Sequence, residues 1–193
     1  DPEMSRGLGD VYKRQIQWGF SQFFPAKAMC AHVTSWNKNT SVKFRTDVAS
    51  MCKLGFDIGL KDMTADELAY CQDAVANWKR LQPAIMDGDQ YRLVSPYETN
   101  HMAVNYVSKD QKKAVLFAYD VYPRFQEKLI NVKLQGLDPN KTYKVEEINL
   151  MPGVDSALKS NGQTYTGDYL MKVGIEVFGS AATQSHVLEL TAM

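Results

Sequence analysis

Met102-Ala103-Val104-Asn105-Tyr106-Val107 and, after a polar interval, Ala114-Val115-Leu116-Phe117-Ala118-Tyr119 are short runs rich in β-branched and aromatic residues. Further runs of this kind are Tyr91 to Val94, Leu129 to Leu134, Tyr143 to Leu150 and Val187 to Leu190. Turn residues separate the runs, most clearly in Gly136-Leu137-Asp138-Pro139-Asn140, where proline fixes φ and asparagine accepts a turn conformation. Short strands at this spacing predict an antiparallel β-sandwich over residues 84–193.

The segment before residue 84 has a different, α/β pattern. Apolar residues recur there at the spacing of a core-facing helix, namely Phe44, Val48, Met51 and Cys52. We expect this helix to end at Gly55 and a short strand to follow over residues 56–60. Between Ile16 and Trp36 the chain is apolar and aromatic, and it fits either a strand and a loop or a short helix and a strand.

Thr64 and Glu67 have the spacing of a capping box, which predicts that a helix begins there. The expected buried stripe of that helix is Leu68, Cys71, Val75 and Trp78, and Pro83 is expected to end it. Helix, strand and helix in close succession indicate a repeating α/β unit. This pattern does not by itself distinguish a barrel from an open sheet.

Composition excludes several classes of protein. The chain has 193 residues, of which 45% are hydrophobic and 23% charged, and Lys+Arg and Asp+Glu balance at 22 each. A balanced charge gives no argument for nucleic acid or an anionic membrane as partner. The Lys109-Asp110-Gln111-Lys112-Lys113 cluster is interpreted as a solvated turn, and no apolar run approaches the ~20 residues that span a bilayer.

We also expect no metal and no cofactor. The three cysteines, Cys30, Cys52 and Cys71, have no metal-ligand spacing, and their apolar surroundings suggest buried thiols. Asp87-Gly88-Asp89 is not followed by further calcium ligands, so Gly88 is interpreted as a turn residue.

The first fifteen residues, DPEMSRGLGDVYKRQ, are polar and differ abruptly from Ile16-Gln17-Trp18-Gly19-Phe20. They resemble the translation of a sequencing adapter at the end of a metagenomic reading frame. We therefore expect residues 1–15 to be non-native and to pack against nothing, and the true protein to continue upstream of Ile16.

Four motifs then resemble glycoside hydrolase family 36. Ile16 to Phe20 and Phe24-Pro25-Ala26-Lys27-Ala28-Met29-Cys30-Ala31-His32-Val33-Thr34 are similar to a family segment in which a proline is followed by Met-Gly-Ala-His-Val-Ser, with Cys30 in place of the usual glycine. Arg45-Thr46-Asp47-Val48-Ala49 and Leu54-Gly55-Phe56-Asp57 resemble the helix and eighth barrel strand that follow. Asp89 to Pro96 resembles the entry into the C-terminal sheet, and Gly167 to Gly174 the terminal motif.

Members of this family are (β/α)8 barrels flanked by β domains, and they hydrolyse terminal α-galactosides such as melibiose and raffinose with retention. The resemblance implies that residues 16–83 are the C-terminal part of the barrel and that residues 84–193 form the β-sandwich. It places the two catalytic aspartates on earlier barrel strands, the fourth and sixth, so no catalytic residue is expected in this chain. The implied partner is a galactoside oligosaccharide in the intact enzyme; oligomeric state and localisation stay open.

Two other functions stay open. One is a non-catalytic carbohydrate-binding or structural β-sandwich module, for which Tyr91, Tyr106, Phe117, Tyr119 and Tyr122 are candidate platform residues, although their alternation favours core packing. The other is an α-N-acetylgalactosaminidase on the same scaffold.

The loop after the implied seventh barrel strand, residues 32–40, contains the candidate substrate-binding residues. Trp36 is suited to stack on a sugar face, and Asn37 and His32 are suited to bond hydroxyl groups. The alternative is structural: a hydrogen-bonded histidine and a partly buried tryptophan cover. Asp57, an acid on a strand of the barrel part, is interpreted as a structural or helix-capping carboxylate.

Overall fold

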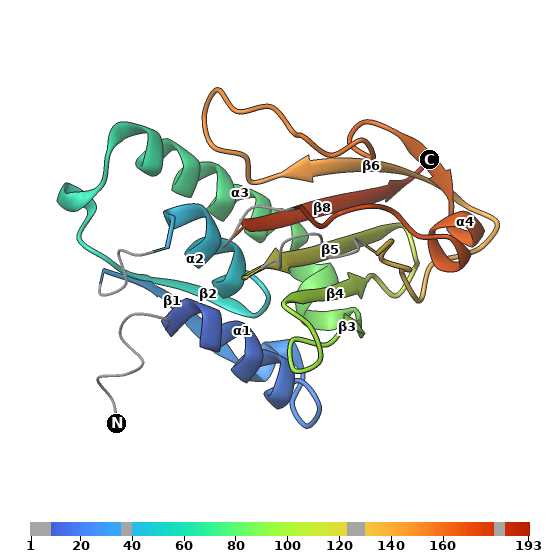
Figure 1. Ribbon diagram of the computed structural model, residues 1–193, viewed down its shortest axis with the longest axis horizontal. Helices are drawn as coiled ribbons and strands as arrows, with labels where there is room; N and C mark the ends of the chain where they lie inside the picture. The colour runs from blue at the N-terminus through green and yellow to red at the C-terminus, as the bar shows by residue number, and fades with distance from the viewer. Residues whose placement is uncertain (1–8, 36–39, 123–129, 180–183) are drawn as a thin grey trace.

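The computed structural model describes residues 9–35, 40–122, 130–179 and 184–193. Figure 1 shows two parts. A parallel pair of strands with its helices lies on the left, and a six-stranded antiparallel sheet lies on the right. The predicted order of an α/β part followed by an antiparallel β part is confirmed. None of the described helices is long and apolar enough to cross a membrane.

The α/β part contains the elements α1 (Gly9–Phe20), η1 (Ala26–Ala28), β1 (Cys30–Thr34), α2 (Val42–Ala49), β2 (Lys53–Asp57), η2 (Leu60–Asp62) and α3 (Ala65–Asp87). Strands β1 and β2 pair in parallel, with α2 as the crossover. Of the two alternatives for residues 16–36, a helix followed by a strand is confirmed.

The β part contains the elements β3 (Asp89–Val94), β4 (His101–Val107), β5 (Lys113–Asp120), β6 (Thr142–Ile148), β7 (Thr164–Thr166), α4 (Gly167–Lys172) and β8 (Gln184–Ala192). The sheet order is β3-β4-β5-β8-β6-β7, and every pair is antiparallel. Neither β7 nor α4 was expected from the sequence.

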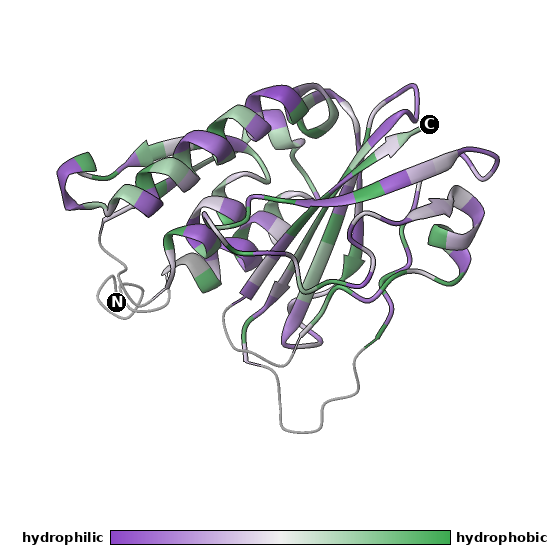
Figure 2. Cartoon of the chain, turned by 90° about the horizontal axis from the view of Figure 1, so that it is seen from above, coloured by the Kyte–Doolittle hydropathy of each residue, from purple (hydrophilic) through white to green (hydrophobic). Residues whose placement is uncertain are grey.

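Both faces of the sheet are buried. One face packs on the helices and contributes Val104, Tyr106, Val115, Phe117 and Tyr119 to a core shared with Phe44, Val48, Met51, Leu81, Ala84 and Ile85. Seen from above, the longer helices lie to one side of the strands and the short helix α4 to the other, and the middle strands carry green segments between purple ones (Figure 2). The alternation of Tyr106, Phe117 and Tyr119 therefore reflects core packing, as the sequence favoured.

Among the described residues, α4 and extended segments cover the opposite face, and no second regular sheet lies on it. This layer contributes Val132, Leu134, Leu137, Leu170, Ile175 and Val177. The strand expected over residues 129–134 is wrong for its described part, because residues 130–134 contain only an isolated bridge between Val132 and Ile175. Val132 and Leu134 alternate because both side chains are buried on the sheet, and an extended segment can bury them without hydrogen-bonding to a neighbouring strand.

Two expected helix ends are wrong. The first helix ends at Ala49, and Gly55 lies inside β2 beside His32 of β1. A Cβ at position 55 would lie 2.0 Å from Cδ2 of the His32 ring, so glycine is required here by a close approach and not by a helix end.

The second helix, α3, begins at the predicted Thr64 capping box but continues through Pro83 to Asp87. It therefore crosses the domain boundary that the sequence placed at residue 84. Proline inside a helix costs about 3 kcal/mol. Burial of Ala84, Ile85 and Met86 against the sheet offsets this cost, since each large side chain contributes about 1.5–3 kcal/mol.

The expectation that residues 1–15 pack against nothing is wrong for residues 9–15. They form most of α1, in which Val11 and Arg14 are 6% and 2% exposed. Residues 1–8 lie outside the described residues, and the non-native origin of residues 1–15 stays a prediction. The expectation of three buried thiols is also wrong in part, because Cys30 is exposed while Cys52 and Cys71 are buried, all three as free thiols.

Candidate functional site

Strands β1 and β2 have one apolar face and one exposed, polar face. Ala31 and Val33 point towards α2, where they pack with Ala49 and Cys52. The alternate residues are Cys30, His32 and Thr34, and their register partners on β2 are Lys53, Gly55 and Asp57. In a (β/α)8 barrel, the face turned away from the helices is the barrel interior.

His32 lies on this exposed face. Its Nε2 lies 3.6 Å from Sγ of Cys30, and its main-chain carbonyl accepts a hydrogen bond of 2.9 Å from Lys13 of α1. The candidates Trp36 and Asn37 lie outside the described residues. Asp57 is exposed and pairs in register with Thr34 at the C-terminal ends of the two strands, and its interpretation as a structural or helix-capping carboxylate stays a prediction.

A cavity of about 290 Å³ lies beside these C-terminal strand ends. It is lined by Ser35, Thr40, Ser41, Val42, Arg45, Ile58, Asp62, Met63 and Glu67, which come from the two βα loops and the first turns of α2 and α3. Hydroxyl, carboxylate and guanidinium groups meet in it. Such a mixture of donors and acceptors suits a neutral, polyhydroxylated ligand.

Arg45 is the buried cation of this cavity and is only 6% exposed. One of its terminal nitrogens, Nη1, donates a hydrogen bond of 2.6 Å to the carbonyl of Thr34, which joins α2 to the end of β1. Its Nε has no hydrogen-bond partner among the described residues.

Asp47, two residues after Arg45 in α2, holds this helix on the β part. Its carboxylate accepts hydrogen bonds from Lys43 (2.7 Å), Tyr70 (3.1 Å), Asn149 (2.9 Å) and Ser185 (2.7 Å). The Tyr119 hydroxyl donates to its main-chain carbonyl at 2.8 Å.

Burial is the largest cause that raises the pKa of Tyr70 and Tyr119, and the neighbouring Asp47 charge raises both further. One signal for this centre is visible in the sequence: Asp47 stands within the apolar helical pattern, where a buried charged residue must be paired.

Two buried acid–histidine pairs lie at the same end of the sheet. His101 Nδ1 lies 2.5 Å from the Asp120 carboxylate, which also accepts a hydrogen bond of 2.7 Å from the amide of Gly179. His186 Nδ1 lies 2.6 Å from Glu147. Burial, the largest effect, raises the pKa of Asp120, and the bonds from Gly179 and His101 only partly oppose it. No group of three or more potential metal ligands occurs among the described residues.

Comparison with known proteins identifies the family. The melibiase family model matches residues 5–88, and the model of the glycosyl hydrolase family 36 C-terminal domain matches residues 101–190. The chain belongs to glycoside hydrolase family 36. The melibiase match begins inside the segment that the sequence indicated to be non-native.

Relatives in this family are α-galactosidases. α-Galactosidase 2 of Hypocrea jecorina is 30% identical over 172 residues, which are 86% of this chain and 21% of that protein. The crystal structure of α-galactosidase AgaB from Geobacillus stearothermophilus superposes with a TM-score of 0.82 at 29% identity and covers 95% of this chain and 24% of that one. A structure of AgaA from the same organism, in complex with raffinose, has a TM-score of 0.80 at 26% identity. The chain spans about a fifth of the length of the curated relatives that it matches.

Proposed function

We propose that this chain is the C-terminal part of a retaining α-galactosidase that hydrolyses terminal α-galactosides of oligosaccharides. In this proposal β1 and β2 are the last two strands of the catalytic barrel, and the antiparallel sheet supports them from outside. The observation that carries it is the two-faced strand pair: its apolar face packs on α2, while its polar face, with His32 and Asp57, is exposed.

The chemistry of retention requires two carboxyl groups about 5–5.5 Å apart, one as nucleophile and one as acid/base. We propose that earlier barrel strands, outside these 193 residues, supply both. The role of this chain is then to shape the rim of the active site, because active sites of such barrels lie at the C-terminal ends of the strands. His32, Trp36 and Asn37 are its proposed contacts with substrate.

The cavity at the strand ends supports this assignment. It lies beside the C-terminal ends of β1 and β2, and Arg45, Asp62 and Glu67 supply donors and acceptors beside the apolar side chains of Val42, Ile58 and Met63. Asp47 and its partners hold α2 at a fixed position on the sheet.

A chimera tests the proposal. Residues 9–193 replace the matching segment of Geobacillus stearothermophilus AgaA, and hydrolysis of nitrophenyl α-galactoside and of raffinose is measured. Turnover of both substrates is the expected result, whereas the 193-residue chain alone releases no nitrophenol. A chimera that is soluble and cooperatively folded but does not hydrolyse either substrate would contradict the proposal, as would turnover by the chain alone.

The three proposed contacts are tested in the active chimera. His32→Ala, Trp36→Ala and Asn37→Ala are each expected to raise KM for raffinose several-fold. Lys79→Ala, on the exposed part of α3, is the matched control and is expected to leave KM unchanged. A KM unchanged in all three variants would limit this loop to a structural role.

A further inference from the structure

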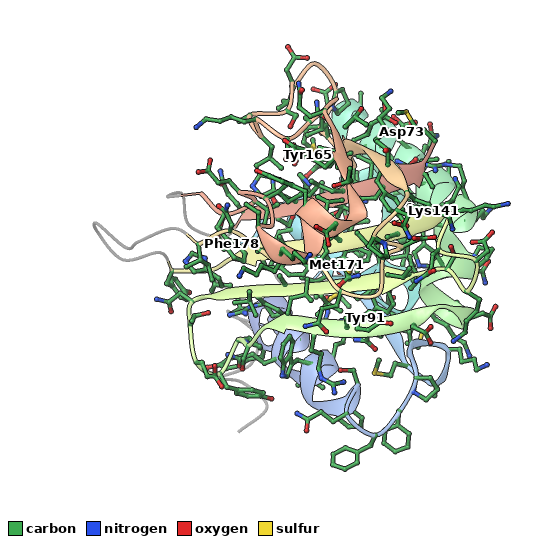
Figure 3. All side chains as sticks on the ribbon, turned by 90° about the vertical axis from the view of Figure 1, so that its right-hand side faces the viewer. Asp73, Tyr91, Lys141, Tyr165, Met171 and Phe178 are labelled. Carbon is green, nitrogen blue, oxygen red and sulfur yellow. The ribbon has the colours of Figure 1, made fainter. Side chains whose placement is uncertain are left out.

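A second pocket lies far from the strand ends, on the outer layer of the sheet. It has a volume of about 250 Å³ and lies between β7, α4 and the extended segments on either side of the Val132–Ile175 bridge. In Figure 3, Tyr165 of β7 is seen above α4, on the side of the molecule away from the helices α1 and α2. This volume is below the ~300–1,000 Å³ of pockets for drug-sized ligands, which suits a single sugar ring.

Two tyrosines form one wall of this pocket. The rings of Tyr165 and Tyr169 stack with centroids 5.3 Å apart and an interplanar angle of 13°, and Tyr169 remains 42% exposed. Stacking fixes both rings before any ligand binds, so little conformational entropy is lost on binding. The face of an aromatic ring carries partial negative charge, and the C–H groups on one face of a pyranose complement it.

A lysine–glutamate ion pair, an amide and a hydroxyl group complete the wall of the pocket. Lys159 and Glu176 lie 3.6 Å apart and are 89% and 60% exposed in their side chains, so the pair is solvated and free to exchange partners. Asn131 supplies an amide, and Ser160, only 4% exposed, has a hydroxyl without a hydrogen-bond partner among the described residues. The paired charges disfavour a charged ligand, and the donors and acceptors favour one with hydroxyl groups.

We propose that this pocket is a non-catalytic binding site for one pyranose unit of a neutral oligosaccharide, with Tyr169 as the stacking platform. Of the aromatic residues that the sequence indicated for such a platform, Tyr106, Phe117 and Tyr119 are buried in the core, Tyr91 is partly buried and Tyr122 is exposed but does not line this pocket. Among the residues that the structure describes, the lining of the strand-end cavity contains no phenylalanine, tyrosine or tryptophan, and neither does that of the pocket beside His186 and Glu147. The inference does not depend on the catalytic role of the intact protein.

Ligand-observed NMR on the 193-residue chain tests the site, with raffinose and melibiose as probes at about 10 mM. The expected result is saturation transfer to the sugar, with a dissociation constant on the order of 1 mM. Amide shifts of Tyr165, Tyr169 and Ile175 are expected to move on titration, and those of Ser35 and Ser41 beside the strand-end cavity serve to separate the two sites.

Variants assign the signal to the platform. Tyr169→Ala is expected to weaken binding at least tenfold, and Tyr169→Phe to change it less than twofold, because the ring stacks without its hydroxyl. Tyr122→Ala removes another exposed tyrosine, 54% exposed at the end of β5, and is expected to have no effect. Asn131→Ala and Glu176→Gln alter exposed side chains only, so their effect is measurable even if Tyr169→Ala unfolds α4.

Three outcomes would overturn the proposal. The first is no saturation transfer to either sugar on the folded chain, and the second is shift changes confined to Ser35 and Ser41. The third is binding as tight as that of wild type in all three variants Tyr169→Phe, Asn131→Ala and Tyr169→Ala. None of these outcomes affects the chimera experiment, in which turnover depends on the barrel.

Discussion

Ser185 of β8 donates a hydrogen bond of 2.7 Å to the carboxylate of Asp47 in α2, across 138 positions of sequence. The same carboxylate is bonded to Asn149, which follows β6 and has φ +58°, a left-handed conformation that asparagine tolerates. The α/β part and the sheet are thus joined by a buried charge with all its acceptor positions in use, and not by apolar contact alone.

Replacement of Asp47 by alanine should therefore be severe. The change leaves the buried groups of Tyr70, Asn149 and Ser185 without their acceptor, and removing one partner of a buried ionic network typically costs 3–5 kcal/mol. Urea unfolding at pH 7 measures the loss. Asp73→Ala, on the exposed face of α3 (Figure 3), is the matched control and should change the free energy of unfolding by less than about 0.5 kcal/mol. If the two variants lost similar free energies of unfolding, Asp47 would not be the residue that joins α2 to the sheet.

Gly88, between α3 and β3, should not accept a side chain. A Cβ at this position would lie 2.2 Å from the carbonyl oxygen of Ala84 and 2.4 Å from that of Val107, both main-chain atoms that cannot move independently. Gly88→Ala is expected to destabilise the chain by about 2 kcal/mol or more, in the range of overpacked sites. Gly9→Ala meets no atom within 4 Å and should be neutral or slightly stabilising. Thermal unfolding of both variants provides the comparison, and a Gly88→Ala variant as stable as wild type would show that the helix–strand junction relaxes.

Pro83 offers the opposite experiment. Its ring is exposed in α3, and it cannot donate the helical hydrogen bond to the carbonyl of Lys79. Pro83→Ala restores this donor and should stabilise the chain by about 1–2 kcal/mol, less than the full cost of an internal proline because the unfolded chain gains freedom. A melting temperature below that of wild type would show that the proline shapes the α3–β3 packing.

Acid stability should depend on Glu147. Burial is the largest effect and raises its pKa, but hydrogen bonds from His186 and Ser156 outweigh burial, and the pKa lies below the ordinary value of 4.5. A carboxyl group with a lowered folded-state pKa contributes stability above its unfolded pKa and loses it as the pH falls. Wild type should therefore lose stability as the pH falls below about 4.5.

Glu147→Gln isolates this contribution. The variant should be less stable than wild type at pH 7, and its unfolding free energy should change less between pH 5 and pH 3. Glu146→Gln, with an exposed side chain on the same strand, is the control and should keep the wild-type pH profile. Parallel profiles for wild type and Glu147→Gln would assign the acid sensitivity to other groups, such as Glu189, whose pKa is raised by burial but lowered overall by Arg80 and Lys113.

The sequence determined the elements whose signals are local. The Thr64–Glu67 capping box, the first half of the α2 stripe (Phe44 and Val48) and five of the strand runs depend on contacts within a few residues or on simple alternation, and the structure confirms them. Met51 and Cys52 of the same stripe are buried but lie beyond the end of α2. The four sequence motifs also identified the family, because they place particular residue types at positions where the backbone accepts few alternatives.

Only the tertiary structure decided the rest, because the deciding contacts lie far apart along the chain. Gly55 is explained by the His32 ring on the neighbouring strand, and Pro83 by core burial of the residues after it. The second layer of the sandwich is irregular because α4 and extended segments bury the apolar face without a ladder of their own. The centre on Asp47 depends on side chains from α3, from β8 and from the segment after β6, for which the sequence has no periodic signal. Tyr165 and Tyr169 are close in sequence, but their stacking depends on the passage from β7 into α4.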